Sequence, residues 1–170
     1  RAERRHALAP VLLEQHAVRH AAAEAGLPHA WPALAARMPA PAAVPAPLTA
    51  WTGLDALSHS LEAICAPGFH PMADGIATEA IRLIHGSLEV AATDGHDLRA
   101  RAHMLAAASM GAVAFQKGLG AMHALAHSIG GLLDSHHGLT IAIVMPYVLS
   151  ANRAAISPTL ERLARALDLA

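Results

Sequence analysis

Histidine and aspartate side chains recur in this sequence at spacings that suit metal binding. Asp55 and His59 lie four residues apart in a stretch with helical periodicity, and His123 and His127 repeat that spacing in an apolar setting. Residues four apart on a helix share one face, with Cβ atoms about 5–6 Å apart. Each pair could therefore reach one cation. An ordinary Asp–His pair on a solvated helix face and two core histidines explain the same spacings.

A further pair of histidines, His136 and His137, lies in the segment DSHHG, which is predicted to be a loop. Neighbouring side chains diverge, so at most one of the two joins a given site, and the spacing does not say which. The segment HALAH has Ala124 where a zinc protease of the HExxH type carries its glutamate base. A mixed set of imidazole and carboxylate donors suits iron, zinc, manganese or cobalt, acting as a Lewis acid on an alcohol or carbonyl oxygen.

Composition narrows the class of protein. The 170-residue chain has a net charge of −1 and 3% aromatic residues, with no basic run, which argues against nucleic-acid binding. It has neither an unbroken run of eighteen apolar residues nor a signal-peptide pattern, so we expect no membrane association. The lone Cys65 cannot pair within the chain, which favours a reducing, cytoplasmic compartment. Because the first residue is Arg1, we expect a fragment or a processed product.

Two regions of the chain differ in composition and in the spacing of their apolar residues. Residues 1–48 are rich in alanine and proline, with a helical stretch at 11–25, and they match no recognised domain. In residues 49–170, apolar side chains recur at helical spacing in five or six segments joined by short turns. We therefore predict an all-α helical bundle for this second region.

Capping residues and prolines predict where several helices begin. Asp97 is expected to cap one helix, and Ser157 with Pro158 is expected to open the last one. The apolar run at 139–151 would also suit a buried strand, because it is rich in β-branched residues. In an otherwise helical chain we predict a buried helix that is kinked at Pro146.

The chain resembles the iron-containing, group III alcohol dehydrogenase family in four segments: GLDALSHSLEA (53–63), HPMADGIATEAIRLI (70–84), ASMGAVAFQKGLGAMHALAHSIGG (108–131) and HHGLTIAIVMPYVLSANR (136–153). The segments come in the family's order and at its spacing. The resemblance implies the helical C-terminal domain of the dehydroquinate synthase-like, iron alcohol dehydrogenase fold. The family's N-terminal α/β half binds the dinucleotide through a GGGS-type loop, which this sequence lacks. We accordingly expect the nucleotide-binding half to be missing and residues 49–170 to be truncated at the C-terminal end.

The resemblance also assigns roles to individual residues. Four positions match the family's metal ligands: Asp55, His59, His123 and His137. The ion would be Fe²⁺, with Zn²⁺ as the alternative. His127 would be a catalytic group beside the nicotinamide and the substrate, where it relays a proton, and His136 would take no part. Glu62 is expected to be either solvated or next to a ligand.

The implied reaction is the NAD(P)-linked oxidation of an alcohol to an aldehyde or ketone, with the metal polarising the substrate oxygen. NAD(P) would belong to the complete enzyme, and the partner would be a small alcohol or aldehyde. We expect exposed apolar surface to be covered by a nucleotide-binding domain or a second copy of the chain. Two other functions stay open: a helical module or decayed remnant without catalysis, and a related metal-dependent lyase or hydrolase.

Replacing single histidines should separate ligands from bystanders. His59→Ala and His123→Ala are each expected to abolish stoichiometric metal binding, because each removes one donor from the expected set. His136→Ala should retain the metal. Elemental analysis of the purified variants measures this, and unchanged metal content in the first two variants would overturn the ligand assignment.

Overall fold

The computed structural model describes residues 44–169, and every regular element in that range is helical. The elements are α3 (Ala46–Cys65), α4 (Pro71–Thr93), α5 (Leu98–Ala114), the short 3₁₀ helix η2 (Phe115–Lys117), α6 (Ala121–Leu133), α7 (His137–Ala151) and α8 (Arg153–Ala166). The prediction of an all-α fold is therefore confirmed for this part of the chain. The helix predicted at 11–25 lies outside the described residues.

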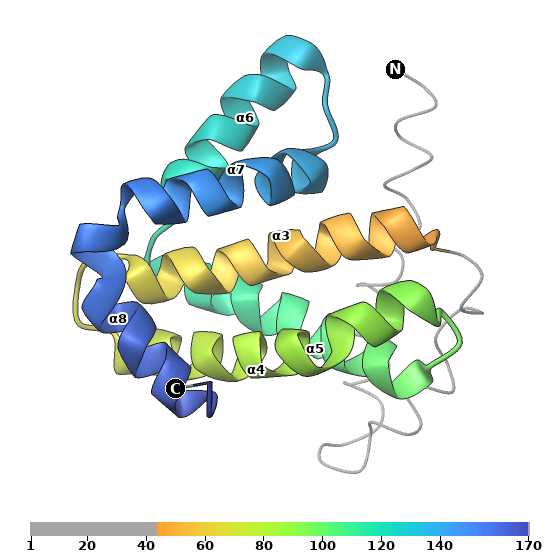
Figure 1. Cartoon of the computed structure of the whole chain (residues 1–170), viewed down its shortest axis with the longest axis horizontal. Helices are drawn as coiled ribbons and strands as arrows, with labels where there is room; N and C mark the ends of the chain where they lie inside the picture. The colour runs from red at the N-terminus through yellow and green to blue at the C-terminus, as the bar shows by residue number, and fades with distance from the viewer. Residues whose placement is uncertain (1–43, 170) are drawn as a thin grey trace.

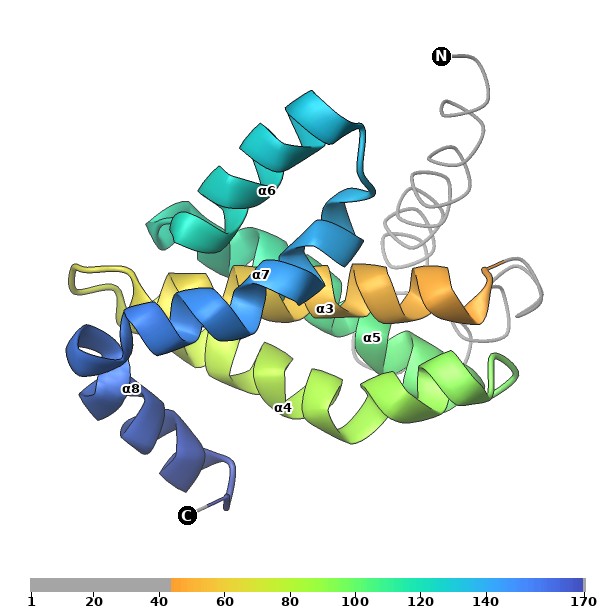
Figure 2. The same ribbon diagram turned by 45° about the horizontal axis from the view of Figure 1, so that its top comes forward.

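Helix α3 is the centre of the described bundle (Figure 1). Helices α4 and α5 pack against α3 and against each other. Helix α7 packs against another side of α3, and α6 packs against α7. Figure 2 shows α6 and α7 lying together on the side of α3 away from α4. Side chains from α6 and α7 therefore meet α3 on a face that α4 leaves open.

Small side chains let the helices approach α3 closely. A Cβ on Gly111 of α5 would lie 3.2 Å from the carbonyl oxygen of Ala56, and a Cβ on Gly138 of α7 would overlap the carbonyl oxygen of Trp51. Much of the core between the helices is built from fully buried alanines: Ala63, Ala77, Ala80, Ala107, Ala114 and Ala126. The backbone of α3 is thus in direct contact with the two neighbouring helices.

Local capping explains several helix starts. The Nδ1 atom of His70 accepts a hydrogen bond from the N–H of Ala73 (3.2 Å), and Pro71 follows at the first helical position of α4. Asp97 caps α5 as predicted, since its Oδ1 accepts from the N–H of Ala100 (2.8 Å).

The predicted start of the last helix was wrong. Helix α8 begins at Arg153 and not at Ser157, whose hydroxyl donates to the carbonyl oxygen of Arg153 (2.8 Å). The N–H groups of Ala155 and Ile156 bond to the carbonyl oxygen of Asn152 (2.9 and 3.1 Å). These bonds form the first turn before the proline, so the Ser-Pro pair lies inside the helix.

The apolar run at 139–151 is helical, as predicted, and α7 continues through Pro146. Contrary to the prediction, the helix is only partly buried, since Ile143 is 58% and Tyr147 74% exposed. By length and composition alone, the run His137–Ala166 is the one helical stretch among the described residues that could cross a membrane, and 28% of its most apolar window is buried. This is weak evidence for a span, because core helices of water-soluble proteins pass the same test. In this structure α7 packs against α3 and α6.

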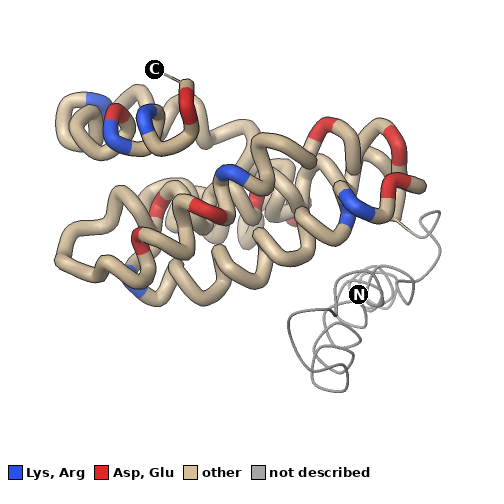
Figure 3. Tube along the Cα trace, turned by 90° about the horizontal axis from the view of Figure 1, so that it is seen from below, with Lys and Arg blue, Asp and Glu red and all other residues tan. Residues whose placement is uncertain are grey.

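Lys, Arg, Asp and Glu residues lie on α3, α4, α5, η2 and α8, whereas α6 and α7 carry none (Figure 3). The ion pair between Lys117 and Asp74 is largely buried. The Nζ atom of Lys117 lies 2.6 Å from Oδ1 of Asp74, and its side chain is 5% exposed, against 33% for the aspartate. Lys117 also donates to the carbonyl oxygen of Ile64 (3.5 Å). The ammonium group therefore ties the turn before α6 to α3 and α4.

The two halves of this ion pair should differ in their effect on stability. Asp74→Ala leaves a buried ammonium group without its carboxylate, at an expected cost of roughly 3 kcal/mol in the free energy of unfolding. Lys117→Met leaves a partly exposed carboxylate that water can solvate, so we expect a loss of about 1 kcal/mol. Urea denaturation of the metal-free variants measures the free energy of unfolding. Equal losses in the two variants would show that burial of the ammonium group does not decide the cost.

Candidate metal centre

Asp55 and His59 lie one turn apart on α3, on the face that α6 and α7 approach. The Oδ1 atom of Asp55 is 3.9 Å from Nε2 of His59, and both side chains are about three-quarters buried, with 24% and 22% exposed. The spacing in the sequence thus brings the pair together as expected.

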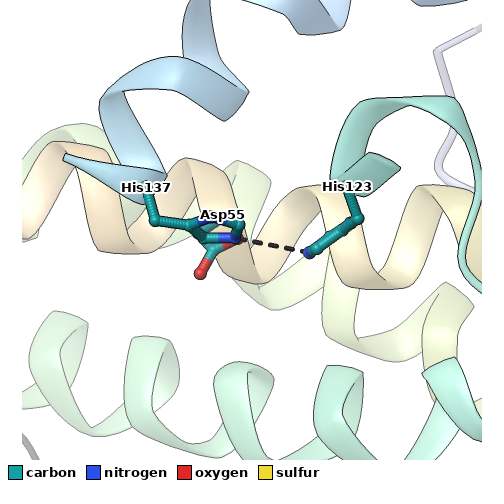
Figure 4. Close-up of side chains that lie close together, drawn as sticks. All are labelled: Asp55, His123 and His137. Atoms are coloured by element: carbon teal, nitrogen blue, oxygen red, sulfur yellow. Dashed lines mark ion pairs between the residues drawn. The ribbon is translucent and has the colours of Figure 1, made fainter. Parts of the chain in front are cut away.

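Two further histidines reach the same carboxylate oxygen from other helices. The Nε2 atoms of His123, in the first turn of α6, and His137, at the start of α7, each lie 3.6 Å from Oδ1 of Asp55. Figure 4 shows the three side chains converging, with the Asp55–His123 ion pair drawn as a dashed line. One potential ligand atom from each of the three lies within 4.8 Å of the others.

These separations suit a shared cation. In a tetrahedral site with bonds of about 2.1 Å, neighbouring ligand atoms lie about 3.4 Å apart. The Oδ1 atom of Asp55 and the Nε2 atom of His123 are both buried, and neither has a hydrogen-bond partner among the described residues. Buried polar atoms without partners are rare and costly. A divalent cation would satisfy both atoms, so the residues present fit a metal ion.

His59 lies beside this group of three. Its ring is stacked on the ring of His123, with centroids 4.7 Å apart and planes 15° from parallel. The other face of the site is also aromatic, because the ring of Phe115 lies 5.2 Å from that of His59. The imidazole of His59 is therefore held next to Asp55 by packing as well as by charge.

The cluster strongly perturbs the titration of its members. Burial alone lowers the pKa of His123, but the carboxylates of Asp55 and Glu62 on its two ring nitrogens outweigh burial and raise the pKa to about 9. Burial alone raises the pKa of Asp55, but the imidazoles, with His123 first, hold it below its ordinary value. In the metal-free protein the positive charge of the cluster therefore resides on His123.

The other two imidazoles favour the neutral form. Burial lowers the pKa of His59 and of His137 below the ordinary value, and the attraction of Asp55 offsets this only in part. Neutral imidazole is the form that binds metals. Two nitrogen donors are thus available near neutral pH without the loss of a proton.

Glu62 is a side chain for which the sequence left two alternatives open, solvated or next to a ligand. It is 7% exposed, and its Oε2 atom lies 2.7 Å from Nδ1 of His123. It is therefore buried against a candidate ligand and not solvated. Glu62 follows His59 by three residues and Asp55 by seven, which puts all three on one helix face. That periodicity was the signal that could have identified it.

His127 and His136 have different positions. The ring of His127 is exposed, 4.9 Å from the ring of His137 and 6.3 Å from that of His123. His136 packs on Trp51 (ring centroids 5.0 Å apart), and its Nδ1 accepts from the N–H of Leu139 (3.3 Å). The loop predicted at 134–138 is therefore shorter, because His136 caps α7 and His137 begins it.

A cavity of ≈ 240 Å³ between α3 and α5 reaches the site. Asp55 and His59 line it, together with Thr52, Met104 and Ala108 among others. A larger cavity of ≈ 590 Å³ lies between α3, α4 and α8, and its lining includes none of the clustered histidines. Of the two, the smaller cavity is the one that the candidate ligands Asp55 and His59 line.

Sequence comparison places these features in a family. Residues 49–170 match the sequence profile of the "Fe-containing alcohol dehydrogenase family, C-terminal". The chain is 48% identical over 124 residues to the 4-hydroxybutyrate dehydrogenase of Cupriavidus necator, a match that covers 70% of this chain and 32% of that protein. It is 44% identical over 109 residues to the 1,3-propanediol dehydrogenase of Citrobacter freundii, covering 64% and 28%. The chain spans about a third of the length of these curated relatives.

Solved structures that resemble this chain include an alcohol dehydrogenase and a diol oxidoreductase. A 1,3-propanediol oxidoreductase matches with a TM-score of 0.71 and 39% identity, covering 74% of this chain and 33% of that one. The alcohol dehydrogenase from Oenococcus oeni matches with a TM-score of 0.70 and 36% identity over the same shares. The resemblance and the helical fold predicted from the sequence are thereby confirmed.

Gly138 should be required for the position of His137. In Gly138→Ala the added methyl group would overlap the Trp51 carbonyl oxygen, so the start of α7 must move away from α3. We expect a loss of about 1–3 kcal/mol in stability and weaker metal binding, measured by urea denaturation and by competition with a chelator.

Gly86→Ala on α4 is the matched control for this prediction. A Cβ there meets no atom within 4 Å, so the variant should be more stable by about 0.5–1 kcal/mol with unchanged metal affinity. Metal affinity of the wild-type value in Gly138→Ala would show that the close approach of α7 to α3 does not set the site.

Proposed function

This chain belongs to the Fe-containing alcohol dehydrogenase family, and we propose that residues 49–170 form the helical domain that holds the catalytic metal of such an enzyme. Asp55, His59, His123 and His137 would be the four ligands. The observation that carries the proposal is the pair of buried atoms without a hydrogen bond, Oδ1 of Asp55 and Nε2 of His123, which face each other at 3.6 Å.

The donor set determines the chemistry that the site can support. When bound, a divalent cation such as Fe²⁺ or Zn²⁺ supplies Lewis-acid chemistry that lowers the pKa of a substrate hydroxyl. NAD(P)⁺, held by the nucleotide-binding part of the complete enzyme, supplies the hydride acceptor. The single carboxylate leaves a net positive charge on a loaded site of this kind, which favours an oxygen that is losing its proton.

This chain's own residues orient the ligands and shape access to them. Asp55 provides the charge around which the three imidazoles gather, and packing on α3 holds His59 and His123 in parallel. The cavity between α3 and α5 would admit a small molecule to the side of the site formed by Asp55 and His59.

His127 is proposed as the proton carrier. Its ring is exposed to solvent and 4.9 Å from the ring of His137, so it lies between the site and bulk water. Histidine is a side chain suited to relaying protons. His127 would accept the proton released by the alcohol and pass it to water.

The substrate is proposed to be a small alcohol that is oxidised to an aldehyde or ketone, or the reverse. The names of the curated relatives refer to 4-hydroxybutyrate and to 1,3-propanediol, both short molecules with a primary hydroxyl group. Their names support a substrate of that size and class.

Partner surface and location complete the proposal. Large apolar side chains on α6 and α7 are exposed: Leu132, Leu133, Ile143 and Tyr147. Such a patch suits contact with the nucleotide-binding part or a second copy of the chain. We also propose that the enzyme is cytoplasmic, in keeping with its lone cysteine, and uses neither nucleic acid nor a membrane.

Metal analysis of the anaerobically purified chain tests the proposal. Near one equivalent of iron or zinc is expected, with loss of the metal in Asp55→Ala and in His137→Ala. His85→Ala is the control, because His85 is an exposed histidine on α4 outside the cluster, and it should retain the metal. No metal above background in the wild-type chain would refute the proposal.

Alcohol-dependent formation of NAD(P)H by the complete enzyme separates a dehydrogenase from a hydrolase or lyase. Loss of that activity in Asp55→Ala is the expected result. Turnover of a substrate without any nicotinamide would instead favour the hydrolase or lyase.

A further inference from the structure

Glu62 connects two helices that are far apart in the sequence. It lies on α3, and its Oε1 atom accepts a hydrogen bond from the backbone N–H of Met122 (2.7 Å) in the first turn of α6. Its Oε2 atom is 2.7 Å from Nδ1 of His123. One buried carboxylate therefore contacts both the backbone and a side chain at the start of α6.

Helix α6 has no capping side chain of its own. Its N-cap residue is Gly120, which has no side chain to accept a hydrogen bond from the first turn. The carboxylate of Glu62 takes this place from α3, where the partial positive charge of the helix N-terminus favours an anion. A Cβ on Gly120 would lie 3.0 Å from Oε1 of Glu62, so glycine leaves room for the carboxylate.

The contacts of Glu62 direct both of its oxygens to the start of α6 and define its effect on His123. Both of its oxygens already have protein partners. Because an ionised carboxylate only accepts hydrogen bonds, Nδ1 of His123 must carry the proton that is shared with Glu62. Nε2 then points at Oδ1 of Asp55, 3.6 Å away, and is the ring atom left to bind a cation.

We propose that Glu62 is a positioning residue of the metal centre, which caps α6 and holds the His123 ring with Nε2 directed at Asp55. This inference rests on the proposed function, since it concerns the metal held by that site. A carboxylate that accepts the second N–H of a ligating histidine fixes the ring and increases its basicity, and loss of such a partner typically weakens metal affinity by about 10–100-fold.

Glu62→Gln is the informative substitution, because it keeps the shape of the side chain. Met122 N–H and His123 Nδ1–H both donate, whereas the amide of glutamine offers one acceptor and one donor. The variant can therefore satisfy only one of the two. Either the cap of α6 is lost, or the amide donates to Nδ1 and the proton moves to Nε2, where it blocks metal binding.

The experiment measures Zn²⁺ affinity of the 170-residue chain by competition with a chromophoric chelator, and the visible absorption of the Co²⁺-loaded protein. For Glu62→Gln we expect an increase of about 10–100-fold in the Zn²⁺ dissociation constant and an altered Co²⁺ spectrum. Gly120→Ala, which crowds the carboxylate and leaves Glu62 in place, should show a smaller increase in the dissociation constant.

Asp74→Asn controls for stability, because Asp74 belongs to the ion pair with Lys117 outside the metal site. It should lower the melting temperature and leave the Zn²⁺ affinity and Co²⁺ spectrum unchanged. Wild-type affinity and an unchanged Co²⁺ spectrum in Glu62→Gln and Gly120→Ala would overturn the inference alone. Failure of the wild-type chain to bind Zn²⁺ or Co²⁺ would overturn the proposed function and this inference with it.

Discussion

The described structure depends on how one buried carboxylate oxygen is surrounded. Oδ1 of Asp55 has the Nε2 atoms of three histidines within 3.6–3.9 Å and no hydrogen bond among the described residues. Moving a carboxylate out of water is costly unless it is paired. The positive charge of His123, or a bound cation, offsets that cost. The helices that bring these histidines are thus held to α3 by charge as well as by apolar packing.

This convergence requires that α5 and α7 approach the backbone of α3 closely. Glycines at the contact points and alanines in the core remove the side-chain volume that would otherwise separate the helices. The consequence is a close arrangement in which candidate ligands from three helices meet. The site is built on helices and not on loops, which favours a fixed geometry.

In the proposed function, the helical domain is the metal-binding part of a dehydrogenase. It offers donors for a cation, an exposed histidine close to them, and a small cavity that reaches Asp55 and His59. The family membership of residues 49–170 relates these features to the Fe-containing alcohol dehydrogenases. The exposed apolar side chains on α6 and α7 are suited to contact with a second protein surface.

The sequence by itself determined the helical class, the pairing of Asp55 with His59 and the family, because these follow from local periodicity and from motifs read in order. It did not determine the start of α8, where backbone bonds to Asn152 extend the helix ahead of the Ser-Pro signal. Before the family was considered, it also left His136 and His137 undivided. The family resemblance separated them, and the physical reason lies in the tertiary structure, where the cap of α7 and the contact of Gly138 with Trp51 turn one ring to Trp51 and the other to Asp55. Only the tertiary structure decided the contacts of Glu62, since its partners lie sixty residues further along the chain and no local pattern encodes a contact between α3 and α6.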